Sequence, residues 1–125
     1  MYEIIVGRDE EDRRAFGDKG TFLIGKHYVK MGQVTSLSTG IYMDVLRSHV
    51  VSVFGKRGSG KSYSLAAIAE GMLTLEPELT RNLSIVIFDT MGIFWTMKYE
   101  NRKDESLLKE WGIPFQRFNM RIYVP

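Results

Sequence analysis

The sequence contains no cysteine among its 125 residues, which excludes disulfide scaffolds, thiol catalysis and cysteine-based zinc sites. Long hydrophobic runs are also missing, because the longest, residues 50–54 and 83–88, fall far short of the roughly 18 residues that span a bilayer. The first dozen residues carry several acids and no signal-peptide core. These absences predict a cytoplasmic protein without a membrane segment or a structural metal.

An excess of one charge is missing as well. Lysine and arginine number 17 against 15 aspartates and glutamates, a net charge of +2, and no segment forms a basic arm. Composition alone therefore gives no support for nucleic-acid binding. Hydrophobic residues make up 44% of the chain and charged residues 26%, as in soluble globular proteins, so we expect a single core with at most a small appendage.

Residues 1–46 form a predicted small β element. Residues 2–6 and 21–29 are rich in β-branched and aromatic side chains, and a charged stretch, 7–20, separates them. Residues 41–45 are a candidate third strand. We expect this element to pack on the main unit and to carry no chemistry itself.

The second predicted part, residues 47–125, begins with the apolar run 50–54, which is typical of a strand covered on both faces in a parallel sheet. A glycine-rich stretch follows. From Lys61 the apolar residues then recur with helical spacing, which predicts a face that packs on the sheet: Leu65, Ile68, Ala69, Met72 and Leu73. Gly71 costs this helix about 1 kcal/mol relative to alanine, less than the burial of several large side chains contributes.

Pro77 is expected to end that helix, and residues 78–82 to form a loop. A second apolar strand is predicted at 84–88, which completes a right-handed βαβ unit. Residues 104–111 predict an amphipathic helix that stops at Gly112, and 121–124 begin another strand. The fold class predicted is therefore α/β with a mostly parallel sheet, preceded by the small β element.

A phosphate-binding motif lies between the first predicted strand and helix. The pattern G-x-x-x-x-G-K-[ST] is met without a mismatch by Gly55, Lys56, Arg57, Gly58, Ser59, Gly60, Lys61 and Ser62. Glycines let the backbone N–H groups approach phosphate oxygens, and the helix N-terminus attracts the anion. Lys61 is the candidate for the β and γ phosphates and Ser62 for Mg²⁺. With Tyr63 these residues form the predicted nucleotide site. ATP is favoured over GTP, because no Asn-Lys-x-Asp segment occurs.

Asp89 is the second candidate catalytic residue beside Lys61. It ends the strand 84–88, at the sheet edge where ligands collect in α/β proteins. Two roles stay open: contact with Mg²⁺ or water, and a structural role. Thr90 follows it, so the glutamate that polarises water in an Asp-Glu pair is missing here.

Other side chains with chemical potential have simpler interpretations. The aromatic cluster in residues 94–99 is either a stacking platform for single-stranded DNA or, as we favour, hydrophobic packing of a helix on the sheet. His27 and His49 lack a partner at a recognisable spacing and are assigned to structure. Lys56 and Arg57 are expected to be solvated rather than to act as an arginine finger.

Residues 41–49, followed by an apolar strand and Gly-Lys-Arg-Gly-Ser-Gly-Lys-Ser, resemble the entry into the ATPase core of the HerA/FtsK family of hexameric DNA-pumping motors. Residues 86–92 look like that family's second strand, which typically ends Asp-Pro-x-Gly-Glu. Thr90 replaces the proline here and Ile93 the glutamate, whereas Asp89 and Gly92 stay in register. The resemblance covers about residues 21–125.

The resemblance implies a RecA-like P-loop NTPase core that uses ATP and Mg²⁺, a homo-oligomeric ring, and DNA as a partner of the assembled or full-length motor. Family members carry a later Asp-Glu strand, a sensor and an arginine finger, none of which is located in residues 46–125, so the chain resembles the N-terminal part of a motor domain. Three functions stay open: an ATP-dependent DNA translocase or helicase component, an ATP-binding module without turnover of its own, and a small P-loop phosphotransferase. For the last, the arginines after Asp89 are scattered: Arg102, Arg117 and Arg121.

Overall fold

The computed structural model describes residues 3–124 and divides the chain into two compact units, with the boundary between Leu83 and Ser84. Tyr2 of the predicted first strand lies outside the described residues. The boundary at residue 46 between the predicted β element and the main unit stays a prediction.

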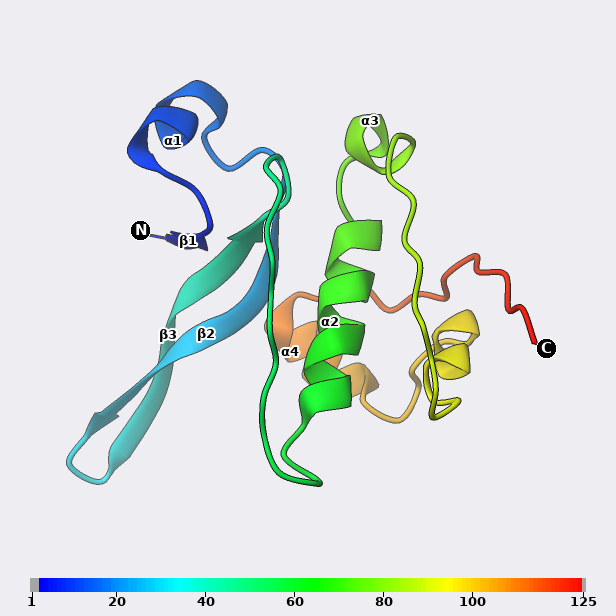
Figure 1. Ribbon diagram of the computed structural model, residues 1–125. Helices are drawn as coiled ribbons and strands as arrows, with labels where there is room; N and C mark the ends of the chain where they lie inside the picture. The colour runs from blue at the N-terminus through cyan, green and yellow to red at the C-terminus, as the bar shows by residue number, and fades with distance from the viewer. Residues whose placement is uncertain (1–2, 125) are drawn as a thin grey trace. The chain divides into compact units, whose positions relative to one another are not determined.

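The first unit contains a three-stranded mixed sheet with the order β1-β3-β2 (Figure 1). Strand β1 (Ile4–Val6) runs parallel to β3 (Val34–Asp44), and β2 (Thr21–Met31) runs antiparallel to β3. β2 and β3 form a long hairpin whose tight turn uses Gly32 at a positive φ of 63°. The predicted strands at 21–29 and 41–45 are thus confirmed, although the second begins earlier and stops at Asp44.

Helix α1 (Glu10–Phe16) lies within the stretch that we expected to be a charged connection. The Asp9 side chain accepts a hydrogen bond of 2.8 Å from the Asp12 N–H and caps the helix. Acids follow in the first turn and arginines in the last, an order that suits the helix dipole. Gly17, at a φ of 57°, ends it.

Helix α2 (Lys61–Leu73) confirms the predicted helix and packs on β2. Ala69 is buried in the helix and Phe22 in the strand, and Phe22 lies directly against Gly71. Leu65 and Leu73 of the predicted face are 47% and 38% exposed, so the sheet covers only part of that face.

The connection after α2 begins with a short helix rather than with the loop that we expected. Residues 77–80, which we assigned to a helix stop and the start of a loop, form the short helix α3 (Pro77–Thr80). Proline is well suited to the first turn of a helix, because its missing N–H would have no partner there.

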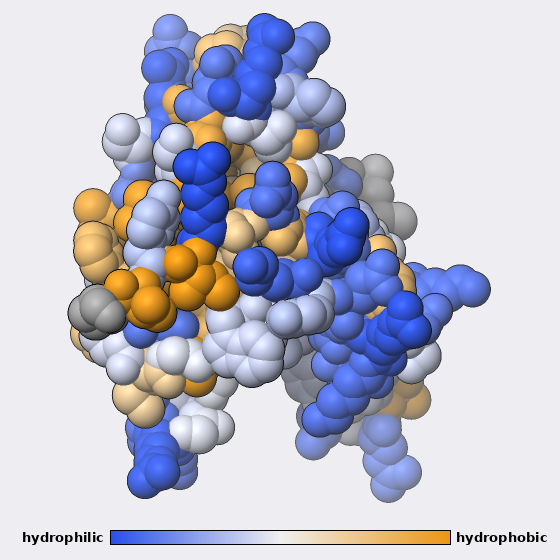
Figure 2. Space-filling view, turned by 90° about the vertical axis from the view of Figure 1, so that its right-hand side faces the viewer, coloured by the Kyte–Doolittle hydropathy of each residue, from blue (hydrophilic) through white to orange (hydrophobic). Residues whose placement is uncertain are grey.

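Residues 50–54 and 84–88 do not form the buried strands of a parallel sheet that we predicted. Within the described part of the chain neither segment pairs with another strand, and Val50 and Phe54 are 96% and 89% exposed. A continuous apolar run predicts a strand paired on both sides, but within residues 3–124 neither run is hydrogen-bonded to a strand. The sheet that forms is small and mixed, rather than mostly parallel. On the face in Figure 2, hydrophobic side chains reach the surface among hydrophilic ones.

The second unit contains the 3₁₀ helix η1 (Phe94–Lys98) and helix α4 (Glu105–Trp111). Met97 is buried, its carbonyl accepts a 3.0 Å hydrogen bond from the Phe118 N–H, and Trp95 and Tyr99 make an edge-to-face contact. The aromatic cluster thus forms a short helix, but no sheet is described beneath it. Helix α4 confirms the predicted helix. Residues 121–124 pair with no strand within the described residues, so the strand expected there is not formed.

Across residues 3–124, no helix has both the length and the hydrophobicity that a membrane crossing requires.

Candidate functional site

The phosphate-binding motif forms the loop that leads into α2. Gly58 and Gly60 have φ values of 78° and 89°, in the left-handed region that favours glycine. A methyl group on Gly55 would lie 2.2 Å from the Ser59 Oγ atom, so the loop folds back closely on itself at this point. Each of the three glycines therefore meets a local geometric requirement.

Gly60 is also the N-cap residue of α2. No side chain caps this end of the helix, and the Ser64 N–H makes the first helical bond, 2.9 Å, to the Gly60 carbonyl. The earlier N–H groups are left to a partner from outside the helix, and the positive end of the dipole favours an anion there. The chain thus places an anion-binding helix end directly after the glycine loop.

Lys61 occupies the first position of α2, and its ammonium group reaches back over the loop. The Nζ atom donates a 2.8 Å hydrogen bond to the Lys56 carbonyl. Ser62 and Tyr63 follow in the first turn and are exposed, as are Lys56 and Arg57 in the loop. Local folding therefore brings the predicted phosphate and metal ligands, Lys61 and Ser62, to the same helix end.

Asp89 lies in the second unit, and its contact is local. Its Oδ2 atom accepts a 2.8 Å hydrogen bond from the Phe94 N–H, which ties the residue to the first turn of η1. Gly92, at a φ of 64°, allows the chain to turn between them. This bond gives Asp89 a structural role; its predicted role toward Mg²⁺ stays a prediction.

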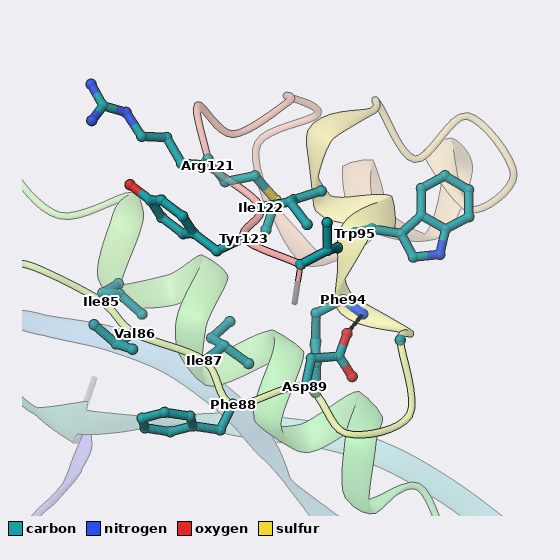
Figure 3. Close-up of a pocket in the computed structure, with 13 residues that line it drawn as sticks. Ile85, Val86, Ile87, Phe88, Asp89, Phe94, Trp95, Arg121, Ile122 and Tyr123 are labelled. Atoms are coloured by element: carbon teal, nitrogen blue, oxygen red, sulfur yellow. Dashed lines mark hydrogen bonds between the residues drawn. The ribbon is translucent and has the colours of Figure 1, made fainter.

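A cavity of about 780 Å³ lies in the second unit beside Asp89 (Figure 3). Two extended segments, 85–89 and 120–124, face each other across it, and Phe94 and Trp95 of η1 complete the lining with Gly92. The lining is mainly apolar. Asp89 and Arg121 are its charged residues, and the Arg121 guanidinium points away from the centre of the cavity (Figure 3).

Sequence reasoning missed a buried polar cluster around Asp44. This carboxylate is 1% exposed and accepts hydrogen bonds from Arg8, from the His49 Nε2 atom at 2.9 Å, and from the backbone N–H groups of Leu46 and Arg47 at 3.3 and 3.2 Å. Burial raises the pKa of Asp44, but the hydrogen bonds from His49 and Arg8 outweigh burial and lower it overall. His49 therefore does have a carboxylate partner, five residues earlier, which corrects our expectation of a lone histidine.

A second ion pair lies close by in the sequence. Arg47 donates hydrogen bonds of 2.8 and 2.6 Å to the two carboxylate oxygens of Asp12 in α1. The hydrogen bonds from Arg47 lower the pKa of Asp12, and those to Asp12 raise the pKa of Arg47. This pair joins α1 to the segment that follows β3.

A family model described as "Helicase HerA, central domain" matches residues 24–123. The chain belongs to the HerA central-domain family. This confirms the resemblance that the phosphate-binding motif and its flanking residues indicated. HerA proteins are ATP-dependent motors with a P-loop NTPase core that uses a nucleotide and Mg²⁺, and the match includes both the glycine loop and Asp89. No curated protein and no solved structure matches the chain.

Proposed function

We propose that the chain binds Mg·ATP through residues 55–63 as part of a HerA-type ATP-dependent DNA translocase or helicase. The observation that carries this proposal is the uncapped N-terminus of α2 directly after a loop with two left-handed glycines, in a chain of the HerA central-domain family. Backbone N–H groups, the helix dipole and the Lys61 ammonium would meet the phosphates, and the Ser62 hydroxyl would bind Mg²⁺.

In the nucleotide-bound state, the Lys61 ammonium exchanges its bond to the Lys56 carbonyl for phosphate oxygens. That 2.8 Å bond holds the charge above the loop before the nucleotide arrives, so little rearrangement is required. A charge-assisted bond to phosphate is also the stronger of the two, because both partners are ionised.

The finer features of the family fold form part of the proposal. We infer that residues 50–54, 84–88 and 121–124 become strands of a RecA-like, mostly parallel sheet in the motor. Their apolar composition supports this, as do the exposed hydrophobic side chains that they present. The motor would assemble as a homo-oligomeric ring, and DNA would bind to the assembled or full-length protein.

A second candidate function is ATP binding without turnover by this chain alone. Thr90 follows Asp89 where a water-polarising glutamate would be expected, and one Asp89 oxygen is already bonded to the Phe94 N–H at 2.8 Å. Hydrolysis requires a group that orients water in addition to the phosphate loop and Mg²⁺. These observations favour a chain that binds the nucleotide and depends on other parts of the motor for catalysis.

Titration calorimetry with Mg·ATP and Mg·GTP tests the proposal on the wild type, Lys61→Ala and Lys109→Ala. Lys109 is an exposed lysine of α4, so its variant removes the same charge outside the loop. Loss of the Lys61 charge should weaken ATP binding by roughly 10 to 150-fold, since a hydrogen bond to a charged group contributes about 1.5 to 3 kcal/mol. Lys109→Ala should bind as the wild type does. Equal affinity in Lys61→Ala and the wild type would refute the assignment.

A further inference from the structure

We propose that Asp44 and His49 form a clamp that fixes the start of the segment leading into the phosphate loop, and thereby sets how often the loop is ready to bind phosphate. The clamp consists of Arg8, Asp44 and His49, and the positioning residue next to the loop is His49. The nucleotide part of this inference rests on the proposed function, whereas the mechanical part does not.

Three chain segments meet at the clamp. Strands β1 and β3 are parallel, so Arg8, just after β1, and Asp44, at the end of β3, lie at the same end of the sheet. The Arg8 guanidinium is bonded to Asp44 and also donates to the Gly17 and Lys19 carbonyls, which tie it to the chain after α1. Asp44 is therefore held from several sides and cannot move independently of the sheet.

His49 attaches the segment that leads into the loop to this rigid group of residues. Its Nε2 atom lies 2.9 Å from the Asp44 Oδ2 atom, and its side chain is only 23% exposed. The ring also lies against the backbone of Gly7, where a methyl group would approach the His49 Cε1 atom to 2.8 Å. A hydrogen bond on one side and a close packing contact on the other thus define the position of the ring.

The chain loses such contacts immediately after His49. Val50 is almost fully exposed, and residues 50–54 join no strand of the described sheet. Within the loop, the Ser59 N–H and the Lys61 Nζ atom make local hydrogen bonds to the Lys56 carbonyl. The next firm attachment is α2, which packs on β2 where Gly71 meets Phe22. In the chain as described, before residues 50–54 join the sheet proposed for the motor, residues 50–59 are therefore attached to the sheet only at their two ends, and His49 is the first of these attachments.

Release of the first anchor should increase the number of conformations of the loop. If the phosphate-binding conformation is a fraction of the ensemble, the apparent dissociation constant rises as that fraction falls. A five-fold smaller fraction gives a five-fold weaker apparent affinity, although no clamp residue touches the nucleotide.

The test compares His49→Ala with His49→Gln. Glutamine retains an N–H donor for Asp44, whereas alanine removes it. Hydrogen–deuterium exchange without nucleotide should be faster at residues 50–60 in His49→Ala and close to wild type in His49→Gln, with β2, β3 and α2 protected in both. Calorimetry should show Mg·ATP affinity reduced by about 5-fold or more in the alanine variant and largely restored in the glutamine variant.

Asp12→Asn is the matched control, because it weakens the neighbouring ion pair with Arg47 and leaves the His49 contact in place. It should leave exchange at 50–60 unchanged. Unchanged exchange at residues 50–60 in His49→Ala would refute the proposed clamp. An equal increase of this exchange in His49→Ala, His49→Gln and Asp12→Asn would refute it as well. If the wild type itself does not bind Mg·ATP, the proposed function fails, while the exchange measurement still decides whether the clamp exists.

Discussion

Gly71 provides the sharpest test of how α2 is seated on the sheet. By helix propensity alone, Gly71→Ala should stabilise the protein by about 1 kcal/mol, because alanine restricts the unfolded chain and favours the helix. The structure argues for the opposite sign. A methyl group at this position would lie 2.2 Å from the Phe22 Cδ2 atom and 2.8 Å from its Cγ and Cε2 atoms.

The magnitude follows from the freedom of the phenylalanine ring. Phe22 is 5% exposed and belongs to β2, so it has no solvent-filled space into which to turn. Either the ring leaves its preferred rotamer or α2 moves away from the strand, and overpacking of this kind costs about 1 to 3 kcal/mol. After the propensity gain is subtracted, Gly71→Ala should destabilise the protein by about 1 kcal/mol, within a range of about 0 to 2 kcal/mol.

Urea denaturation followed by circular dichroism measures the effect, and a second background isolates its cause. In a Phe22→Ala protein the ring atoms that meet the methyl group are absent, so the same Gly71→Ala change should become neutral or stabilising. The two effects should therefore not be additive, as expected for residues in contact. A gain of about 1 kcal/mol from Gly71→Ala in the wild-type background would refute the close seating of α2 on β2.

Three further outcomes are expected. Ser62→Ala should weaken ATP binding chiefly when Mg²⁺ is present; calorimetry showing the same loss in EDTA would contradict a metal-ligand role. Stability should fall in acid: because the folded-state pKa of Asp44 is lowered, its contribution is present above about pH 4 and is lost as the pH drops through the folded pKa. Denaturation between pH 7 and pH 3 should show a shallower dependence in Asp44→Asn, and an unchanged slope would count against the cluster. The chain alone should release no more phosphate from ATP than its Lys61→Ala variant, whereas Lys61-dependent turnover at about 1 s⁻¹ or faster would contradict our view of the missing water-orienting group.

The elements that the sequence predicts well are those defined by local signals. Helix α2 follows a glycine loop and has helical apolar spacing, and α4 ends at Gly112, which adopts the left-handed conformation with a φ of 67°. The phosphate loop belongs to the same class, because its glycines satisfy requirements that involve only near neighbours in the chain.

Helix α1 was predictable but was not predicted. Its cap, Asp9, its acidic first turn and its final Gly17 are all helix signals in the sequence. The segment has so few apolar residues that hydrophobic periodicity gives no indication of a helix. Here the capping residues were more informative than the hydrophobic pattern.

The cluster around Asp44 could not be predicted, because no local sequence signal defines it. Arg8 and Asp44 are far apart in the sequence and meet only because β1 pairs with the end of β3. Asp44 and His49 are close in sequence, but a spacing of five residues matches no recurrent catalytic or ligand motif. A contact that depends on the register of a sheet can be recognised only after the strands have been paired.

The apolar runs show why a hydrophobic pattern alone does not determine a sheet. In residues 84–88 the side chains alternate as in a strand: Ile85 and Ile87 are half-buried, whereas Val86 and Phe88 are 74% and 92% exposed (Figure 3). An inner strand of a parallel sheet is apolar on both faces because a layer of helices covers each face. The apolar composition of residues 84–88 is therefore that of a strand buried on both faces. Within the described residues, however, only the face with Ile85 and Ile87 is covered. The backbone direction and the side-chain alternation of a strand are properties of the segment itself, whereas its hydrogen bonds and its second covered face belong to its neighbours, and this is why residues 84–88 have the form of a strand without being part of a sheet.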